Sequence, residues 1–230
     1  MSIFRTFLLK SIEAINPSGD LIFLLFRLRR RAITFPSVTM SGSELERYFH
    51  RNAFNKNILE FGSGGSTIFF AEIGKHVTSV ESDRLFSKKM QSHIRILRLQ
   101  HKATVFWTNI GPTKSYGQPW GFLKLFYRNR YSRYFSQVFN TFEKIKDVDF
   151  VFVDGRFRVA CTMAVLLNIE KGFTLVIDDF FDRPEYSTVL DVLNNPNLRV
   201  GNTAIFEVNR ESLDLALIKA IFLKYSYDPR

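Results

Sequence analysis

The chain has 230 residues, 46% of them hydrophobic and 23% charged, a composition that excludes a disordered protein and fits one sizeable domain with short additions. Because the chain has a single cysteine, Cys161, it cannot form an internal disulfide. Its net charge of +10 is compatible with a polyanion or an anionic membrane surface as a partner. Residues 1–56 hold nine Lys and Arg against four acidic residues, and residues 112–146 hold seven against one. Residues 147–230 hold thirteen acidic residues against nine basic ones, which favours an acidic site in this part of the chain.

Residues 1–50 are predicted to form a basic, helical arm ahead of the domain. Apolar residues recur at helical spacing in residues 4–15, without the long apolar core and cleavage site of a signal peptide. The apolar run LIFLLF at residues 21–26 precedes an arginine cluster and is far shorter than the ~20 residues that cross a bilayer. We therefore expect a cytoplasmic protein. Two interpretations of the arm stay open, peripheral contact with a membrane and packing against the domain.

Residues 51–230 are predicted to form an α/β domain, because strand and helix patterns alternate from residue 57 onward. Short apolar or β-branched segments indicate strands at residues 57–61, 76–82, 103–107, 148–153 and 174–180. Helical patterns lie between them at residues 65–74, 83–99 and 159–170. This alternation predicts a doubly wound, mostly parallel sheet with helices on both faces and a ligand at the carboxyl ends of the strands. Residues 111–146 are longer than a simple connection needs, and we expect them to form a lid-like insertion.

A cluster of glycines and serines follows the first predicted strand, in the segment ILEFGSGGST. A dinucleotide fingerprint starting at Gly62 would need a glycine where Thr67 stands, and Glu60 would repel a pyrophosphate. A phosphate-binding P-loop would need Gly-Lys-Ser/Thr, which is absent from this segment. A cationic ligand such as S-adenosylmethionine, with its sulfonium and amino groups, would instead be attracted by Glu60. Glu81 ends the second strand, 21 residues later, and is placed to accept both ribose hydroxyls; Asn109 ends the third and could contact adenine.

The segments ILEFGSGGST and TSVESD resemble the first two motifs of the class I S-adenosylmethionine-dependent methyltransferases. The resemblance implies a seven-stranded Rossmann-like sheet and S-adenosylmethionine as cofactor. Many relatives have an aspartate where Asn109 stands in this chain. The segments DGRFRVAC and DDFFDRPEY also resemble a poorly characterised bacterial branch of this family. The residues expected to contact the cofactor are Glu60, Gly62, Ser63, Gly64, Gly65, Ser66, Glu81, Ser82 and Asn109.

Three carboxylates, Asp154, Asp178 and Asp179, end the fourth and fifth predicted strands. Their arrangement is similar to that of the catechol-type O-methyltransferases, in which acidic and amide side chains hold a divalent metal. The resemblance makes Mg²⁺ a candidate second cofactor, with these three residues as ligands. The alternative is that they pair with arginines of the same region, residues 156, 158 and 183. The residues expected to take part in catalysis are Asp154, Asp179 and Arg156.

The acceptor is predicted to be a small molecule or a sugar-like compound that is methylated on oxygen. Methylation of a nucleobase amino group would normally show an Asp/Asn-Pro-Pro-Tyr/Trp motif after the fourth strand, where this chain has DGRF. Nucleic acid is therefore a disfavoured partner, and an RNA methyltransferase is a minor alternative. The other alternative is a non-catalytic protein that keeps the cofactor fold and docks on an anionic surface or partner.

Overall fold

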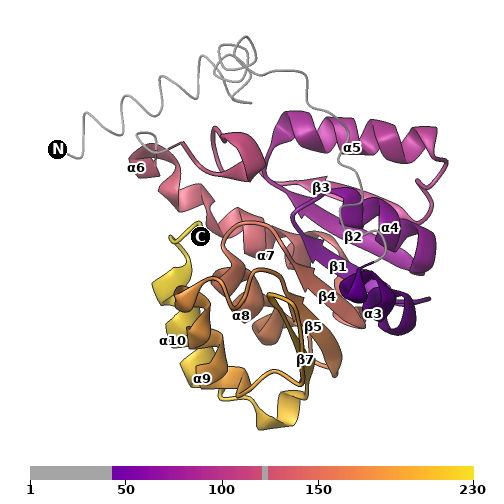
Figure 1. The fold of residues 1–230 in the computed structure, drawn as a ribbon. Helices are drawn as coiled ribbons and strands as arrows, with labels where there is room; N and C mark the ends of the chain where they lie inside the picture. Colours follow the sequence, from indigo (N-terminus) through magenta and orange to yellow (C-terminus); the bar gives the residue numbers. More distant parts are fainter. Residues whose placement is uncertain (1–42, 121–123) are drawn as a thin grey trace.

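The computed structural model describes residues 43–120 and 124–230 of the chain. Seven strands form one sheet in the order β3-β2-β1-β4-β5-β7-β6 (Figure 1). The first five are parallel, whereas β7 is antiparallel to both β5 and β6. This arrangement confirms the predicted mostly parallel, doubly wound sheet. The strands are β1 Asn57–Phe61, β2 His76–Glu81, β3 Ala103–Trp107, β4 Phe150–Val153, β5 Phe173–Ile177, β6 Leu198–Val200 and β7 Thr203–Val208.

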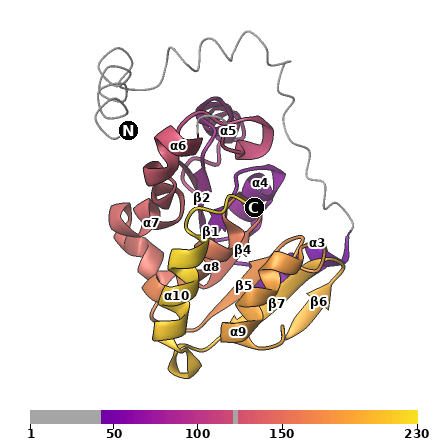
Figure 2. The ribbon, with the colours of Figure 1, turned by 90° about the vertical axis from the view of Figure 1, so that its left-hand side faces the viewer.

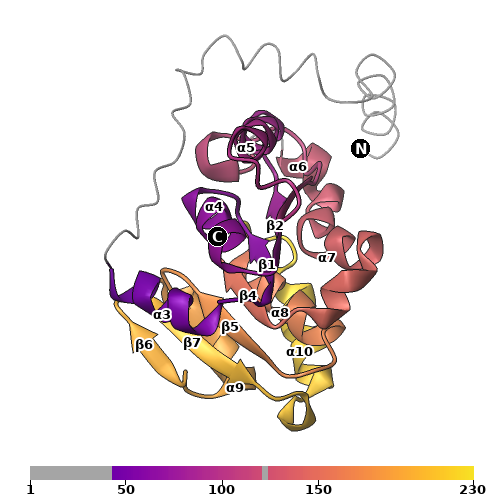
Figure 3. The same cartoon turned by 90° about the vertical axis from the view of Figure 1, so that its right-hand side faces the viewer.

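Helices cover both faces of the sheet and make a three-layer structure, as the turned views show (Figures 2 and 3). One face is covered by α3, α4 and α5, and the other by α7, α8 and α10. Two short helices, α6 and α9, lie in connections. The helices are α3 Glu44–Asn52, α4 Gly65–Ile73, α5 Arg84–Ile96, α6 Lys124–Tyr127, α7 Ser132–Thr141, α8 Arg158–Asn168, α9 Leu190–Leu193 and α10 Leu215–Tyr225.

The alternation of side chains along β1 shows how the strands divide between two hydrophobic cores. Ile58 packs on the α4 side, whereas Leu59 and Phe61 pack on the α8 side. Because successive strand residues point to opposite faces, Glu60 points to the same side as Ile58, toward α4. Because both faces of the sheet are buried, the parallel strands are apolar almost throughout. Glu60, a charged residue type that points into one of the two cores, is an exception to this pattern.

Helix α3 is attached to the domain by an aromatic cluster. Phe49 is fully buried, and its ring centroid lies 5.0 Å from that of Phe70, 5.3 Å from Phe152 and 5.7 Å from Phe150. Aromatic rings at these distances pack favourably in edge-to-face or tilted geometry. This helix crosses the boundary expected at residue 50, while the rest of the predicted arm, residues 1–42, lies outside the described residues. None of the helices in the described ranges is long and apolar enough to cross a bilayer.

The segment expected as a lid-like insertion, residues 111–146, has two structural parts. Helix α7 contributes Tyr134, Phe135 and Val138 to the core on the α8 side, so this part is a layer of the domain. Residues 111–120 instead run past the ends of the strands and contain a single helical turn at Ser115–Gly117. Of the expected insertion, residues 111–120 are thus a part that lies at the ends of the strands, where a ligand is expected.

Candidate active site

The turn after β1 brings the backbone close to the turn after β4. Gly62 has φ 102°, in the region that favours glycine, and its N–H donates to Val80 O at 2.9 Å. A Cβ on Gly62 would lie 2.6 Å from the Cα of Gly155, so the two turns are in backbone contact. Gly64 differs, because a Cβ there would meet only the Ser66 hydroxyl, at 3.9 Å. Gly64 and the start of α4 at Gly65 thus leave room beside free helix N–H groups, which suits close approach of a ligand.

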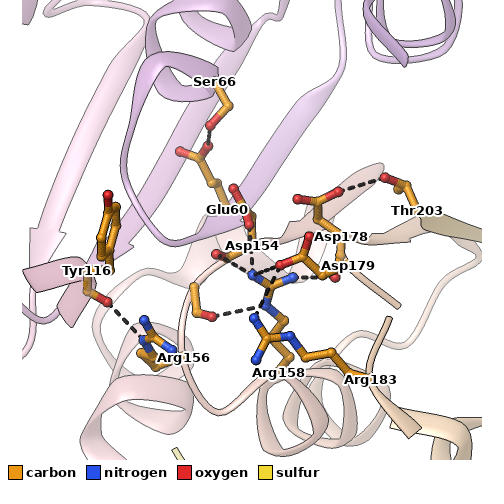
Figure 4. Close-up of polar contacts among 11 residues, drawn as sticks. Glu60, Ser66, Tyr116, Asp154, Arg156, Arg158, Asp178, Asp179, Arg183 and Thr203 are labelled. Carbon is orange, nitrogen blue, oxygen red and sulfur yellow. Dashed lines mark hydrogen bonds and ion pairs between the residues drawn. The ribbon is translucent and has the colours of Figure 1, made fainter. Parts of the chain in front are cut away.

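Glu60 is fully buried and is held by two hydroxyl groups from the first turn of α4. Ser66 Oγ donates to its Oε1, and Thr67 Oγ1 donates to its Oε2 at 2.5 Å (Figure 4 shows the Ser66 contact). Burial raises the pKa of Glu60 to about 7, although these hydrogen bonds oppose the shift. The carboxyl group is thus poised to lose its proton when a positive charge comes near.

Glu81 is the second buried carboxyl group at this edge of the sheet. Its Oε1 accepts a 2.6 Å hydrogen bond from the Asp83 N–H, and Asp83 in turn caps α5. Burial raises the pKa of Glu81 to about 7. We refer to the turn after β1, residues 62–64, as the glycine turn. Between the two glutamates, Ser63 Oγ shares a 2.7 Å hydrogen bond with Ser79 Oγ, which connects the glycine turn to β2.

These two carboxyl groups fit the cationic cofactor that the sequence predicts. Within residues 43–120 and 124–230, neither Glu60 nor Glu81 makes an ion pair, so no protein cation there compensates their charge. A buried carboxylate is stabilised strongly by a nearby positive charge. The amino and sulfonium groups of S-adenosylmethionine would supply that charge.

The loop after β3 begins at Asn109 and folds over the ends of two strands. Asn109 Oδ1 accepts a 3.0 Å hydrogen bond from the Gly111 N–H, a side-chain turn that starts the loop. Within the loop, the Lys114 N–H donates to Gln118 O at 2.6 Å, and Thr113 pairs with Pro119 as an isolated bridge. We refer to residues 113–119 as the strap.

The strap is attached at both sides of the glycine turn. Ser82 Oγ, at the end of β2, donates to Gly117 O at 3.3 Å. Arg156 Nε, after β4, donates to Tyr116 O at 2.9 Å (Figure 4). Because β1 lies between β2 and β4 in the sheet, the strap passes over the ribose side of the expected cofactor site. Both attachments join residues more than 30 positions apart, and sequence spacing contains no signal for them.

Replacing Gly117 with alanine is expected to loosen the strap and weaken binding of S-adenosylmethionine about tenfold. Gly117 has φ 68°, and a Cβ there would lie 2.5 Å from Ser82 Oγ, so either the strap moves away from β2 or the Ser82 hydroxyl turns away and gives up its hydrogen bond to Gly117 O. Isothermal titration calorimetry measures the change. Gly201→Ala is the matched control, because Gly201 has φ 58° but nothing within 4 Å of the added Cβ. Equal losses of affinity in the two variants would contradict a role for the strap.

The turn after β4 holds Asp154 in a fixed position. Phe157 adopts φ 57° and ψ 36°, and its buried ring packs 5.1 Å from Tyr131 and 5.9 Å from Tyr134. A left-handed conformation is costly for a bulky residue and persists because the core holds the ring. A Cβ on Gly155 would lie 2.1 Å from Tyr134 Oη, so this position requires glycine. The carboxylate of Asp154 is therefore presented from a rigid turn.

Arg158, in the first turn of α8, joins the ends of β4 and β5. Its Nη2 contacts Asp154 Oδ1 at 3.0 Å and Asp179 Oδ2 at 3.2 Å (Figure 4). The guanidinium also donates to the backbone oxygens of residues 154, 155 and 178. With 8% of its side chain exposed, Arg158 is a buried cation that donates from all three of its guanidinium nitrogens.

This arrangement does not fit the metal ion that the resemblance to catechol-type enzymes implies. Asp154 and Asp179 are occupied by Arg158, and Asp178 Oδ1 accepts a 2.7 Å hydrogen bond from Thr203 Oγ1. Among the described residues, no group of three or more His, Cys, Asp or Glu could hold a metal ion. The structure instead shows the alternative left open by the sequence, in which Asp154 and Asp179 form ion pairs with arginines. The reason is geometric, since Arg158 begins α8 directly after the tight turn that holds Asp154, and its side chain reaches back to the ends of β4 and β5.

Removing the Arg158 side chain is expected to destabilise the fold by about 3–5 kcal/mol, because two carboxylates and three carbonyl groups lose a buried partner. Arg158→Met keeps the apolar stem, and urea unfolding of this variant measures the loss. Arg183→Gln is the control, because Arg183 makes a 3.5 Å ion pair with Asp179 but is 37% exposed, and its loss is expected to cost less than about 1 kcal/mol. A similar midpoint for wild type and Arg158→Met would show that the arginine does not hold β4 to β5.

Asp154 combines access to the site with a raised pKa. Its side chain is 39% exposed, in contrast to Glu60. Desolvation, together with the negative charges of Asp178 and Glu60, raises the pKa of Asp154 to about 7 against the opposing effect of Arg158. A carboxylate with this pKa can accept a proton near neutral pH.

No family model and no curated protein matches this chain. A crystal structure of a methyltransferase-like protein from Silicibacter pomeroyi is 34% identical, covers 85% of this chain and 99% of its own, and superposes with a TM-score of 0.73. An O-methyltransferase from Bacillus cereus in complex with S-adenosylhomocysteine is more distant, at 17% identity, 96% and 80% coverage and a TM-score of 0.44. With the strand order and the two motifs, the first similarity identifies the chain as a member of the class I S-adenosylmethionine-dependent methyltransferases.

Proposed function

We propose that the protein methylates a hydroxyl oxygen of a small-molecule or sugar-like acceptor. The observation that carries this proposal is Asp154, a partly exposed carboxylate with a pKa near 7 on the rigid turn that contacts the glycine turn. A hydroxyl group is a weak nucleophile unless a base removes its proton as it attacks, whereas a neutral amine is a good nucleophile before it loses a proton. A base at this position therefore favours oxygen as the methylated atom.

The cofactor is proposed to lie across the ends of β1 and β2. Glu60 would face its amino group, Glu81 its ribose hydroxyls, and the backbone from Gly62 to Ser66 its methionine part. Ser82 would contribute beside Glu81, and Asn109 would meet the adenine edge. Support comes from the burial of both glutamates, their raised pKa values, and the open space above Gly64. The strap would then close over the ribose.

When bound, S-adenosylmethionine supplies an electrophilic methyl group whose bond to sulfur breaks as the new carbon–oxygen bond forms. Asp154 accepts the acceptor's hydroxyl proton. Arg156 holds the strap through Tyr116 and faces the acceptor, and Asp179 keeps Arg158 in place beside Asp154. The protein's contribution is thus alignment of the acceptor and removal of one proton. Because Arg158 occupies the carboxylates, no step is assigned to a metal ion.

The test is a product assay with S-adenosylmethionine and a panel of hydroxyl, amine and thiol acceptors, in which formation of S-adenosylhomocysteine is measured. We expect turnover with hydroxyl acceptors, a methyl ether or ester as product, and no loss of rate with EDTA. Methylation of amines alone would contradict the proposed acceptor atom. Loss of turnover in EDTA, restored by Mg²⁺, would show that a metal displaces Arg158.

A further inference from the structure

Three arginines gather beside Asp154, and they differ in how many of their donors are used (Figure 4). Arg158 donates from each of its three guanidinium nitrogens, to five oxygen atoms in all. Arg156 donates from Nε alone, and no oxygen in the described ranges accepts from its Nη1 or Nη2. Arg183 makes one side-chain hydrogen bond within the described residues, from Nη2 to Asp179 Oδ2 at 3.5 Å, and its guanidinium carbon lies 6.0 Å from the centre of the Tyr186 ring. Two guanidinium groups of this site therefore keep most of their hydrogen-bonding capacity.

The positive charge of these two side chains is also incompletely balanced. Arg158 already takes the carboxylates of Asp154 and Asp179, and Arg183 shares only the second of them. Burial, and then the neighbouring positive charges of Arg158 and Arg183, lower the pKa of Arg156, so its charged form is disfavoured by both neighbours. An anion placed between them would relieve this repulsion and satisfy the unused donors.

The backbone holds Arg156 in position for this task. Cys161 Sγ donates to the backbone oxygen of Arg156 at 3.3 Å, and Tyr116 O in the strap accepts from its Nε, so the backbone and the Nε of Arg156 are held while Nη1 and Nη2 keep their donors. Arg156 follows the proposed base by two residues on the same turn. A group bound by its guanidinium fork would sit beside the carboxylate that removes the acceptor's proton.

We propose that Arg156 and Arg183 together bind an anionic group of the acceptor, a carboxylate or a phosphate, so that the substrate is a small hydroxyl compound carrying negative charge. The inference rests on the proposed O-methylation and names its substrate class. Guanidinium groups bind both anions through paired N–H donors, which fixes orientation as well as affinity. The same pair of arginines would discriminate against neutral hydroxyl compounds of equal size.

The test uses the full chain saturated with S-adenosylhomocysteine and two probes that differ by one carboxylate, catechol and 3,4-dihydroxybenzoate. Calorimetry should show the carboxylate probe binding about tenfold more tightly, a difference of about 1.4 kcal/mol. This preference should fall to less than about twofold in both Arg156→Gln and Arg183→Gln. It should persist in Arg95→Gln, a control in the last turn of α5 whose side chain is exposed. Competition by inorganic phosphate and by benzoate shows which anion the site prefers.

Equal binding of the two probes to the wild type, or no binding of the carboxylate probe at about 10 mM, would overturn the inference. If only Arg156→Gln loses the preference for the carboxylate probe, and if this variant also binds the cofactor more weakly, the preference depends on the strap. That result would also overturn the inference. Tighter binding of RNA than of either probe, with a steep dependence on salt, would assign the arginines to a polyanion instead. The cofactor titration on the same sample separates the two proposals. If S-adenosylmethionine does not bind, the proposed function fails; if it binds without an anion preference, only the substrate class fails.

Discussion

Replacing Asp154 with asparagine is expected to lower kcat by about a hundred- to ten-thousandfold, while the dissociation constant for S-adenosylmethionine changes by less than about threefold. The amide has nearly the shape of the carboxylate and can still accept from Arg158, so the turn after β4 should keep its structure. It cannot take up the hydroxyl proton. Initial rates of S-adenosylhomocysteine formation measure the first quantity, and calorimetry measures the second.

The pH profile separates a base from a structural carboxylate. Because the pKa of Asp154 is raised to about 7, turnover should increase as pH rises through 7, where the carboxyl group loses its proton. The neighbouring charge of Asp178 contributes to this shift, so Asp178→Asn should move the rising limb to lower pH and keep most of the maximal rate. An Asp154→Asn enzyme with more than about a tenth of wild-type turnover would contradict the assignment.

Replacing Glu60 with glutamine is expected to weaken S-adenosylmethionine binding by about ten- to a hundredfold and yet to stabilise the protein without cofactor at pH 8. The variant loses the negative charge that the cofactor's cationic groups would meet. It also removes the need to keep a charged carboxylate in a fully buried position. A pKa raised from 4.5 to about 7 corresponds to a penalty on the order of 3 kcal/mol above pH 7, of which the glutamine should recover part.

The direction of the pH effect follows from proton binding. Between pH 4.5 and 7 the folded protein keeps the Glu60 proton that the unfolded chain has released, so the stability from this group declines as pH rises through that window. Glu81 should act in the same direction. Urea unfolding at several pH values should show a smaller decline in Glu60→Gln, and Glu143→Gln, an exposed site, should match the wild type. A variant that is less stable at pH 8 and binds the cofactor normally would show that Glu60 only supports the fold.

The parts of this fold that depend on local pattern were predictable from the sequence. Residues 57–61, 76–82 and 103–107 were expected as strands, and β1, β2 and β3 match them to within one residue. The sequence also predicted correctly that the glycine turn follows β1 and that Glu60 and Glu81 lie at the carboxyl ends of β1 and β2. Their burial follows from the alternation of side chains in a sheet that is covered on both faces.

The contacts that decide the chemistry depend on the assembled sheet, and residue spacing did not resolve them. Carboxylates at the ends of β4 and β5 suit a metal ion or an arginine equally well in sequence, and only the geometry of α8 brings Arg158 between them. The strap depends on hydrogen bonds from Ser82 and Arg156, both far away along the chain. Short motifs contain the proposed cofactor-binding elements, whereas the proposed acceptor side is built from long-range contacts.

The close contact of Gly62, Gly155 and Tyr134 has a consequence for how this enzyme could diversify. A side chain at either glycine would collide with backbone or with the tyrosine hydroxyl. The contact between the turn after β1 and the turn after β4 therefore tolerates almost no amino-acid substitution. The exposed positions of the strap and of the segment after β5 are under no such steric constraint, since Tyr116 is 90% exposed and Arg183 is 37% exposed, whereas Gly117 within the strap is constrained. New acceptor preferences should therefore arise by substitution in these two segments, and directed evolution libraries are best concentrated there.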